Sequence, residues 1–255
     1  MGQPGLNVRL ETFVSVLYGA ALSYGFYAFV MSLKGGLDVL KPLLDGDWAN
    51  SDRLVPHIQV GLLFWAVGYF LLCDYCGMAR VNTLFPYRRR SPRFGLDCVI
   101  VVFYVMLFES CTNCSVLFPF EFTLLLFFCA AWGDRLRKEA DLYVSATEGD
   151  LSVRLGIVAR DVAHSWGAII RNSHVVGGFL LLIITAVLLF SNYDEGQLSR
   201  HMTLWQESVV LVVLLGWHTL TVAYAIGASR SPDHLLVSGY LPKFIEKLVS
   251  KEDSK

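Results

Sequence analysis

The chain has 255 residues, of which 55% are hydrophobic and 17% are charged, and its mean hydropathy is +0.51. This composition is too apolar for an ordinary soluble domain. The formal net charge of -1 gives no indication of a nucleic-acid partner. We therefore expect an integral membrane protein that is embedded in the lipid bilayer.

Six apolar stretches follow one another along the chain and predict an all-α, six-span membrane domain that takes in residues 1–255. The third and fourth stretches need a turn between them, because one helix over both would be roughly 58 Å long, about twice the hydrocarbon thickness of a bilayer. A tight hairpin is therefore expected there. The predicted spans are residues 11–33, 54–75, 95–112, 115–132, 172–191 and 207–228.

Basic residues are concentrated in alternate connections between these spans. Of the 21 Lys and Arg residues, all but four fall on one side, and those four are Lys34, Lys41, Arg53 and Arg200. Cytoplasmic connections carry the excess of basic residues in membrane proteins. Both termini, the segment 134–171 and the tail 229–255 are therefore expected in the cytoplasm.

The two longest cytoplasmic segments carry amphipathic patterns. Apolar residues from Leu151 to Ile169 recur at steps of three and four, which predicts a helix within 134–171. This helix either lies along the membrane surface or continues into the fifth span. A shorter apolar stripe with interspersed lysines in the tail 229–255 indicates contact with lipid or with another subunit.

His218 is the most suggestive polar residue within a predicted span. It lies near the middle of the sixth span, with Thr221 and Tyr224 at helical offsets on one broad face. An ionisable group at that depth is costly unless it meets a polar partner, water or a metal ion. Glu121 in the fourth span is a second candidate. Both can serve a polar path, and both can instead bond a neighbouring helix or reach toward the interface.

Small and polar residues form a stripe along the first span. Ser15, Gly19, Ser23 and Tyr27 are spaced at steps of four and share one side of a helix. Such a stripe can line a pore, and it can equally let two helices approach closely.

The segment Arg9-Leu10-Glu11-Thr12-Phe13-Val14-Ser15 resembles the start of the six-helix endolysosomal and bacterial potassium channel family, whose first helix opens with R-x-x-x-F-S-D. Arg9 and Phe13 match the defining positions. Val14 and Ser15 stand where the family has Ser and Asp, and Ala20 stands where it has a bulky aliphatic residue. Together with the six-span plan, the resemblance implies an ion channel.

Six cysteines include two C-x-x-C pairs, Cys73 with Cys76 and Cys111 with Cys114. Such pairs can exchange disulfides, so a membrane thiol-disulfide oxidoreductase is an alternative function. The topology places the first pair at the inner face and the second at the outer face, which argues against a direct relay and a shared four-cysteine zinc site. We expect no metal site and no cofactor.

Four arginines stand just before the third span, on its cytoplasmic side. Arg88, Arg89, Arg90 and Arg93 are candidates for contact with anionic lipid headgroups, or they serve only to fix the orientation of the chain. No nucleophile, phosphate or nucleotide motif is visible, so an enzyme is the less expected class.

The leading hypothesis from the sequence is an oligomeric channel for ions or small solutes, built from copies of this chain. A non-catalytic accessory or sensor subunit of a larger membrane complex is the first alternative. The thiol-disulfide oxidoreductase is the second.

Overall fold

The computed structural model describes residues 4–33, 51–87, 91–144, 150–194, 197–198 and 201–229. In these residues the protein is all-helical, as predicted, apart from one short antiparallel pair of strands, β1 (Tyr193–Asp194) and β2 (Gln197–Leu198). The helices are α1 (Pro4–Ser32), α3 (Ser51–Leu84), α4 (Pro92–Thr112), α5 (Phe118–Val144), α6 (Asp150–Ser191) and α7 (Leu204–Ser229).

Four of these helices are long and apolar enough to cross a membrane. The spanning segments are Arg9–Ser32 in α1, His57–Ala79 in α3, Pro92–Thr112 in α4 and Ala163–Ser191 in α6. All four overlap predicted spans, and the segment in α6 begins nine residues before the predicted fifth span. This supports a membrane protein, with the crossing by α5 and α7 remaining a prediction.

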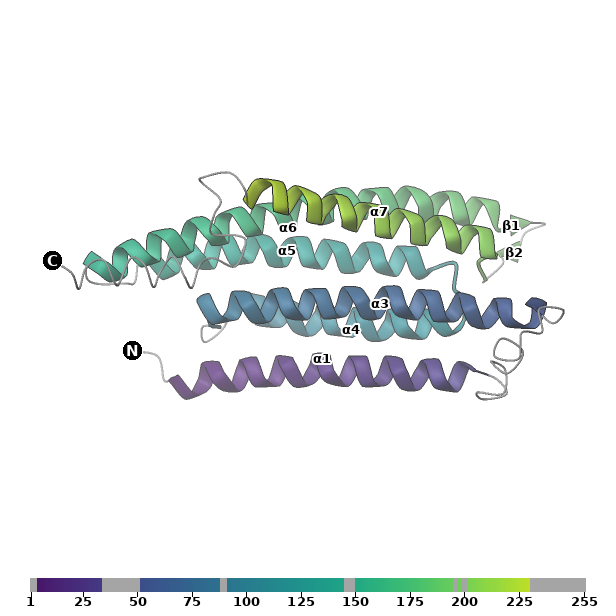
Figure 1. Ribbon diagram of the computed structural model, residues 1–255, viewed down its shortest axis with the longest axis horizontal. Coiled ribbons are helices and arrows are strands. Elements are labelled where there is room, and N and C mark those ends of the chain that lie inside the picture. The colour runs from purple at the N-terminus through teal and green to yellow at the C-terminus, as the bar shows by residue number, and fades with distance from the viewer. Residues whose placement is uncertain are drawn as a thin grey trace.

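The helices lie side by side in one bundle and alternate in direction along the chain (Figure 1). The beginning of α1, the end of α3, the beginning of α4 and the end of α7 all lie at the left end of the view. The described residues that flank the predicted basic connections lie at this same end. We call it the basic end, and the end that carries β1 and β2 the opposite end.

The turn between α4 and α5 is the tight hairpin expected at the opposite end. The Ser115 N–H donates to the Ser110 carbonyl at 3.1 Å, and the Cys114 N–H donates to the Cys111 carbonyl at 3.2 Å. Cys114 has a φ of 44°, in the left-handed region. Two such bonds around a left-handed residue form a Schellman motif, which satisfies the last carbonyls of α4.

Helix α6 is one continuous helix of 42 residues, about 63 Å long at 1.5 Å per residue. The amphipathic helix predicted within 134–171 therefore runs directly into the fifth predicted span. Helix α5 likewise continues past residue 132, the predicted end of its span, to Val144. The basic-end part of α6 projects beyond the other helices in Figure 1.

Two glycines bring the backbones of α5 and α6 into contact. A Cβ atom added at Gly167 would lie 2.6 Å from the carbonyl oxygen of Gly133, and one added at Gly133 would lie 2.9 Å from the carbonyl oxygen of Gly167. Nearer the basic end, the His164 Nε2 lies 2.8 Å from the Asp141 carboxylate. The two helices therefore form a closely packed pair.

Aromatic side chains dominate the core of the bundle. The Phe70 ring on α3 meets Phe122 of α5 edge-on at 5.1 Å between centroids and stacks on Trp217 of α7 at 5.9 Å. Tyr18 of α1 lies 6.4 Å from Tyr104 of α4. This packing joins α3 to α5 and α7, and it joins α1 to α4, around the interior where the polar side chains described next are found.

Candidate functional site

Polar side chains from four helices meet around Asp74 on α3. The Tyr104 hydroxyl on α4 and the Cys129 thiol on α5 both donate to the Asp74 Oδ2 atom, the thiol at 3.6 Å. Asp74, Cys129 and His174 on α6 each have a metal-ligating atom within 4.8 Å of those of the other two. We call Asp74, Tyr104, Cys129 and His174 the Asp74 cluster.

The His174 ring is held in one tautomer by its own helix. Its Nδ1 atom lies 2.8 Å from the Ile170 carbonyl oxygen. A carbonyl oxygen can only accept a hydrogen bond, so Nδ1 carries the proton and Nε2 keeps its lone pair. The Trp217 ring packs edge-on against His174 at 5.4 Å and restricts it further.

His218, the leading candidate from the sequence, lies beside the Asp74 cluster. Its Nε2 atom is 2.9 Å from the Tyr69 hydroxyl oxygen on α3. Its ring packs edge-on against Tyr69 and Phe70, with centroid distances of 5.1 and 5.0 Å. The polar partner that an ionisable group at this depth needs is therefore Tyr69.

A cavity of about 190 Å³ joins these groups. Asp74, Cys129, His174 and His218 line it together, and Asp97 in the second turn of α4 lines it as well. Since one water molecule occupies about 30 Å³ in the liquid, the cavity has room for several waters or for a hydrated ion.

Arg93 and Glu139 form a buried ion pair near the basic end. The Arg93 Nε lies 3.3 Å from a Glu139 carboxylate oxygen on α5, and its side chain is 0% exposed. The guanidinium also donates to the Phe85 carbonyl and lies over the rings of Tyr87 and Trp132 at 5.1 and 5.7 Å.

The lipid-headgroup prediction for Arg93 is therefore wrong. Its carboxylate and aromatic partners lie inside the bundle and draw its side chain inward. Arg88, Arg89 and Arg90 lie outside the described residues, so their lipid contact stays a prediction. Between Arg93 and the cavity, the Tyr87 hydroxyl donates to Asp97, and burial raises the pKa of Tyr87 above its usual range.

Glu121 lies at the opposite end of the bundle, away from the Asp74 cluster. It accepts a hydrogen bond from the Ser110 hydroxyl across the α4–α5 hairpin. Gln59 at the start of the α3 spanning segment and Glu207 in the first turn of α7 are buried at the same end. These residues form a second polar level in the bundle.

The predicted stripe on α1 faces away from the cavity. Ser23 is exposed and donates to the Gly19 carbonyl at 2.8 Å, and Tyr27 is 60% exposed. Ser15 is half-buried. The buried face of α1 is a different one, which carries Tyr18. The stripe therefore lies on the outer surface of the single chain.

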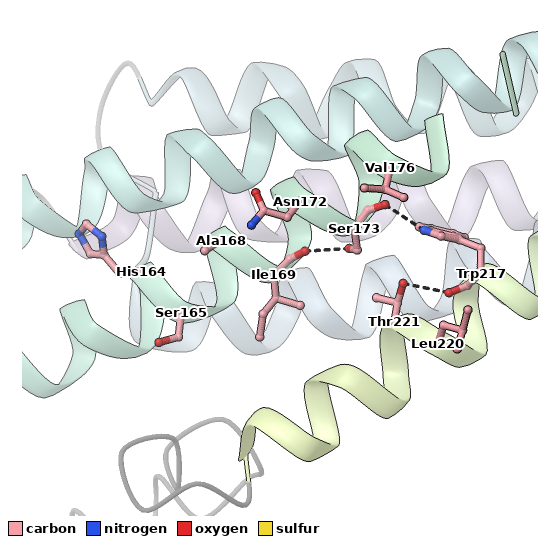
Figure 2. Close-up of a pocket in the computed structure, with 10 residues that line it drawn as sticks. All are labelled: His164, Ser165, Ala168, Ile169, Asn172, Ser173, Val176, Trp217, Leu220 and Thr221. Carbon is pink, nitrogen blue, oxygen red and sulfur yellow. Dashed lines mark hydrogen bonds between the residues drawn. The ribbon is translucent and has the colours of Figure 1, made fainter. Parts of the chain in front are cut away.

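Thr221 lines a separate groove between α6 and α7, shown in Figure 2. The groove has a volume of about 630 Å³ and runs from His164 to Trp217. Two of its hydroxyl groups bond their own helices: Thr221 donates to the Trp217 carbonyl at 3.0 Å and Ser173 to the Ile169 carbonyl at 2.8 Å. The side chain of Tyr224 lies outside the described residues.

All six cysteines are free thiols. The Cys73 and Cys76 pair lies within α3, and the Cys111 and Cys114 pair lies at the α4–α5 turn. Burial, with a smaller contribution from Glu207, raises the pKa of Cys114 to about 11. The Cys114 thiol is therefore protonated at neutral pH, which makes it a poor nucleophile for disulfide exchange.

The sequence analysis missed the Asp74 cluster. Asp74 falls in the predicted second span, Cys129 in the fourth and His174 in the fifth. The same argument from intramembrane ionisable groups that selected His218 applies to Asp74 and His174. Whether these three side chains meet depends on the rotation of each helix about its own axis. The spacing of residues along one helix does not give this rotation.

No family model, no curated protein and no solved structure matches the chain. The resemblance of its first helix to the potassium channel family stays a prediction.

Proposed function

We propose that the protein is a membrane channel for the passive passage of cations. The Asp74 cluster is the cation-binding site along the permeation path. The observation that carries this proposal is the cavity inside the bundle, where a carboxylate meets two imidazoles. Ionisable groups inside membrane segments are rare and mark ion pathways and proton relays.

Polar groups at further levels of the bundle support a path along its interior. Asp97, which lies near the beginning of α4, also lines the cavity. Gln59, Glu121 and Glu207 supply polar groups at the opposite end. Acidic side chains prevail along this path, and rings and clusters of acidic groups favour cations over anions.

The stripe on the outer surface of α1 then has the second of the two roles considered from the sequence, which is close packing against another helix. The stripe consists of small residues, of which Gly19 and Ser23 are exposed and Ser15 is half-buried. Small residues let membrane helices of separate subunits approach closely. We assign this stripe to contact between copies of the chain, in keeping with the proposed oligomer.

Cation flux into proteoliposomes tests the proposal. Vesicles with the purified protein are expected to take up a potassium tracer faster than empty vesicles. Asp74→Asn keeps the shape of the side chain and removes its charge, so it is expected to lower the flux at least about tenfold, the effect of roughly 1.4 kcal/mol at the barrier. The matched control is Asp141→Asn, because Asp141 is exposed and lies outside the cavity.

An absence of flux from the well-folded parent protein would overturn the channel proposal. The projecting part of α6, which extends past the other helices, favours a subunit of a larger complex as the second candidate (Figure 1). In that case a partner should co-purify with the parent protein, and deletion of residues 150–160, which keeps the ion pair between Arg93 and Glu139, should release it.

A further inference from the structure

Three types of metal ligand converge at the Asp74 cluster. Asp74 supplies a carboxylate, Cys129 a thiol and His174 an imidazole, and they come from three different helices. Their ligating atoms already lie within 4.8 Å of one another. In a tetrahedral zinc site with bonds of about 2.0–2.3 Å, ligand atoms lie roughly 3.3–3.8 Å apart, so small side-chain rotations close the site.

Neighbouring groups hold two of these ligands in the orientation that metal sites use. The His174 Nδ1–H donates to the Ile170 carbonyl at 2.8 Å, which leaves the Nε2 lone pair for a metal. The Asp74 carboxylate accepts a hydrogen bond from the Tyr104 hydroxyl. Metal-binding histidines usually donate their second ring nitrogen to a carbonyl or carboxylate, and ligating carboxylates are themselves hydrogen-bonded.

The space for an ion is present as well. The cavity of about 190 Å³ is lined by all three ligands, and His218 faces the same space. A fourth ligand can therefore come from a water molecule or from the His218 imidazole. The cavity distinguishes this cluster from a packed set of hydrogen-bonded side chains.

We propose that Asp74, Cys129 and His174 bind one divalent transition-metal ion of the zinc type, with water or His218 as the fourth ligand. A thiolate with an imidazole favours such an ion over Mg²⁺ and Ca²⁺, which take oxygen ligands. On binding, the Cys129 thiol releases its proton to solvent and the sulfur bonds the metal. The inference concerns binding alone and holds whether the ion stays in place or is itself the permeating cation.

Cobalt is a spectroscopic probe for this site. The full chain, purified in detergent and stripped with a chelator, is titrated with Co²⁺ and then with competing Zn²⁺. We expect one ion per chain and a thiolate-to-cobalt charge-transfer absorption that Zn²⁺ abolishes. Cys129→Ser should remove this absorption, and Asp74→Asn and His174→Gln should each weaken binding at least tenfold. Cys98→Ser is the matched control, because Cys98 lies on α4 outside the cavity.

A second measurement needs no variant. Zn²⁺ bound to the parent protein should protect Cys129, but not the exposed Cys76, from alkylation in mildly denaturing detergent, as read by mass spectrometry. The proposal is overturned if the folded parent gives no charge-transfer absorption, or if Co²⁺ binding survives in folded Cys129→Ser. Metal binding without any cation flux would uphold this site and reject the channel, whereas potassium flux without metal binding would do the reverse.

Discussion

The Arg93 side chain illustrates how a charge is accommodated inside this bundle. Its guanidinium is fully buried and is balanced by Glu139, by a backbone carbonyl and by two aromatic rings. Breaking a buried ion pair leaves one uncompensated charge, which costs about 3–5 kcal/mol. We therefore expect Arg93→Ala to lower the free energy of unfolding by about this amount, measured by thermal or denaturant unfolding in detergent.

The double variant Arg93→Met with Glu139→Met is the control for this prediction. It removes both charges and keeps apolar volume, and such replacements are often neutral or stabilising. A loss in Arg93→Ala that is no larger than the loss in the double variant would show that packing, and not the charge of Glu139, explains the effect.

Cys114 occupies a backbone position that suits glycine. Its φ of 44° lies in the left-handed region, where a side chain costs about 1 kcal/mol. Cys114→Gly is therefore expected to unfold at a higher temperature than Cys114→Ala, since both lose the thiol and only glycine relieves the strain. Equal melting temperatures of the two variants in detergent would contradict this reading of the α4–α5 turn.

At the scale of the helices, the contact between α5 and α6 gives the sharpest prediction. An alanine methyl group at Gly167 would meet the Gly133 carbonyl oxygen at 2.6 Å. Overpacking of this kind costs typically about 1–3 kcal/mol, so Gly167→Ala should lower the thermal stability. Gly216→Ala is the matched control, because nothing lies within 4 Å of the added Cβ atom. Equal stability of the two variants would show that the helices separate easily.

Most of the helices could be predicted from the sequence, and their ends only in part. The spans predicted at 11–33, 54–75 and 95–112 lie within or nearly match α1, α3 and α4. The fourth predicted span ends at residue 132 because charged residues follow and lower the local hydropathy. The helix continues because Asp134 and Lys138 pair at 2.7 Å one turn apart, and because α5 packs along α6.

The candidate site was less predictable than the helices. His218 could be selected because the free-energy cost of burying an ionisable side chain depends on its depth in the membrane. That depth follows from the position of the residue within a predicted span. Its bond to Tyr69, and the meeting of Asp74, Cys129 and His174, depend on how the helices are rotated about their axes. Arg93 was misplaced for the same reason, because its partner Glu139 lies on another helix.

For the molecule as a whole, the alternating helices and the basic end predict an orientation that labelling can test. Lys138 lies near the basic end and Tyr193 at the opposite end, and both side chains are largely exposed. In a background without the native cysteines, Tyr193→Cys should react with an impermeant thiol reagent in intact cells, and Lys138→Cys should react only after lysis. The opposite pattern would invert the proposed topology.

The ion pair between Arg93 and Glu139 also bears on how the chain is made. The two residues stand at the beginning of α4 and toward the end of α5, so the apolar parts of both helices separate them in the chain. During synthesis Arg93 leaves the ribosome long before the carboxylate that neutralises it. A lone arginine resists burial in lipid. We therefore expect the beginning of α4 to stay at the membrane surface until Glu139 emerges, and Arg93 to become buried only when α5 packs against α4.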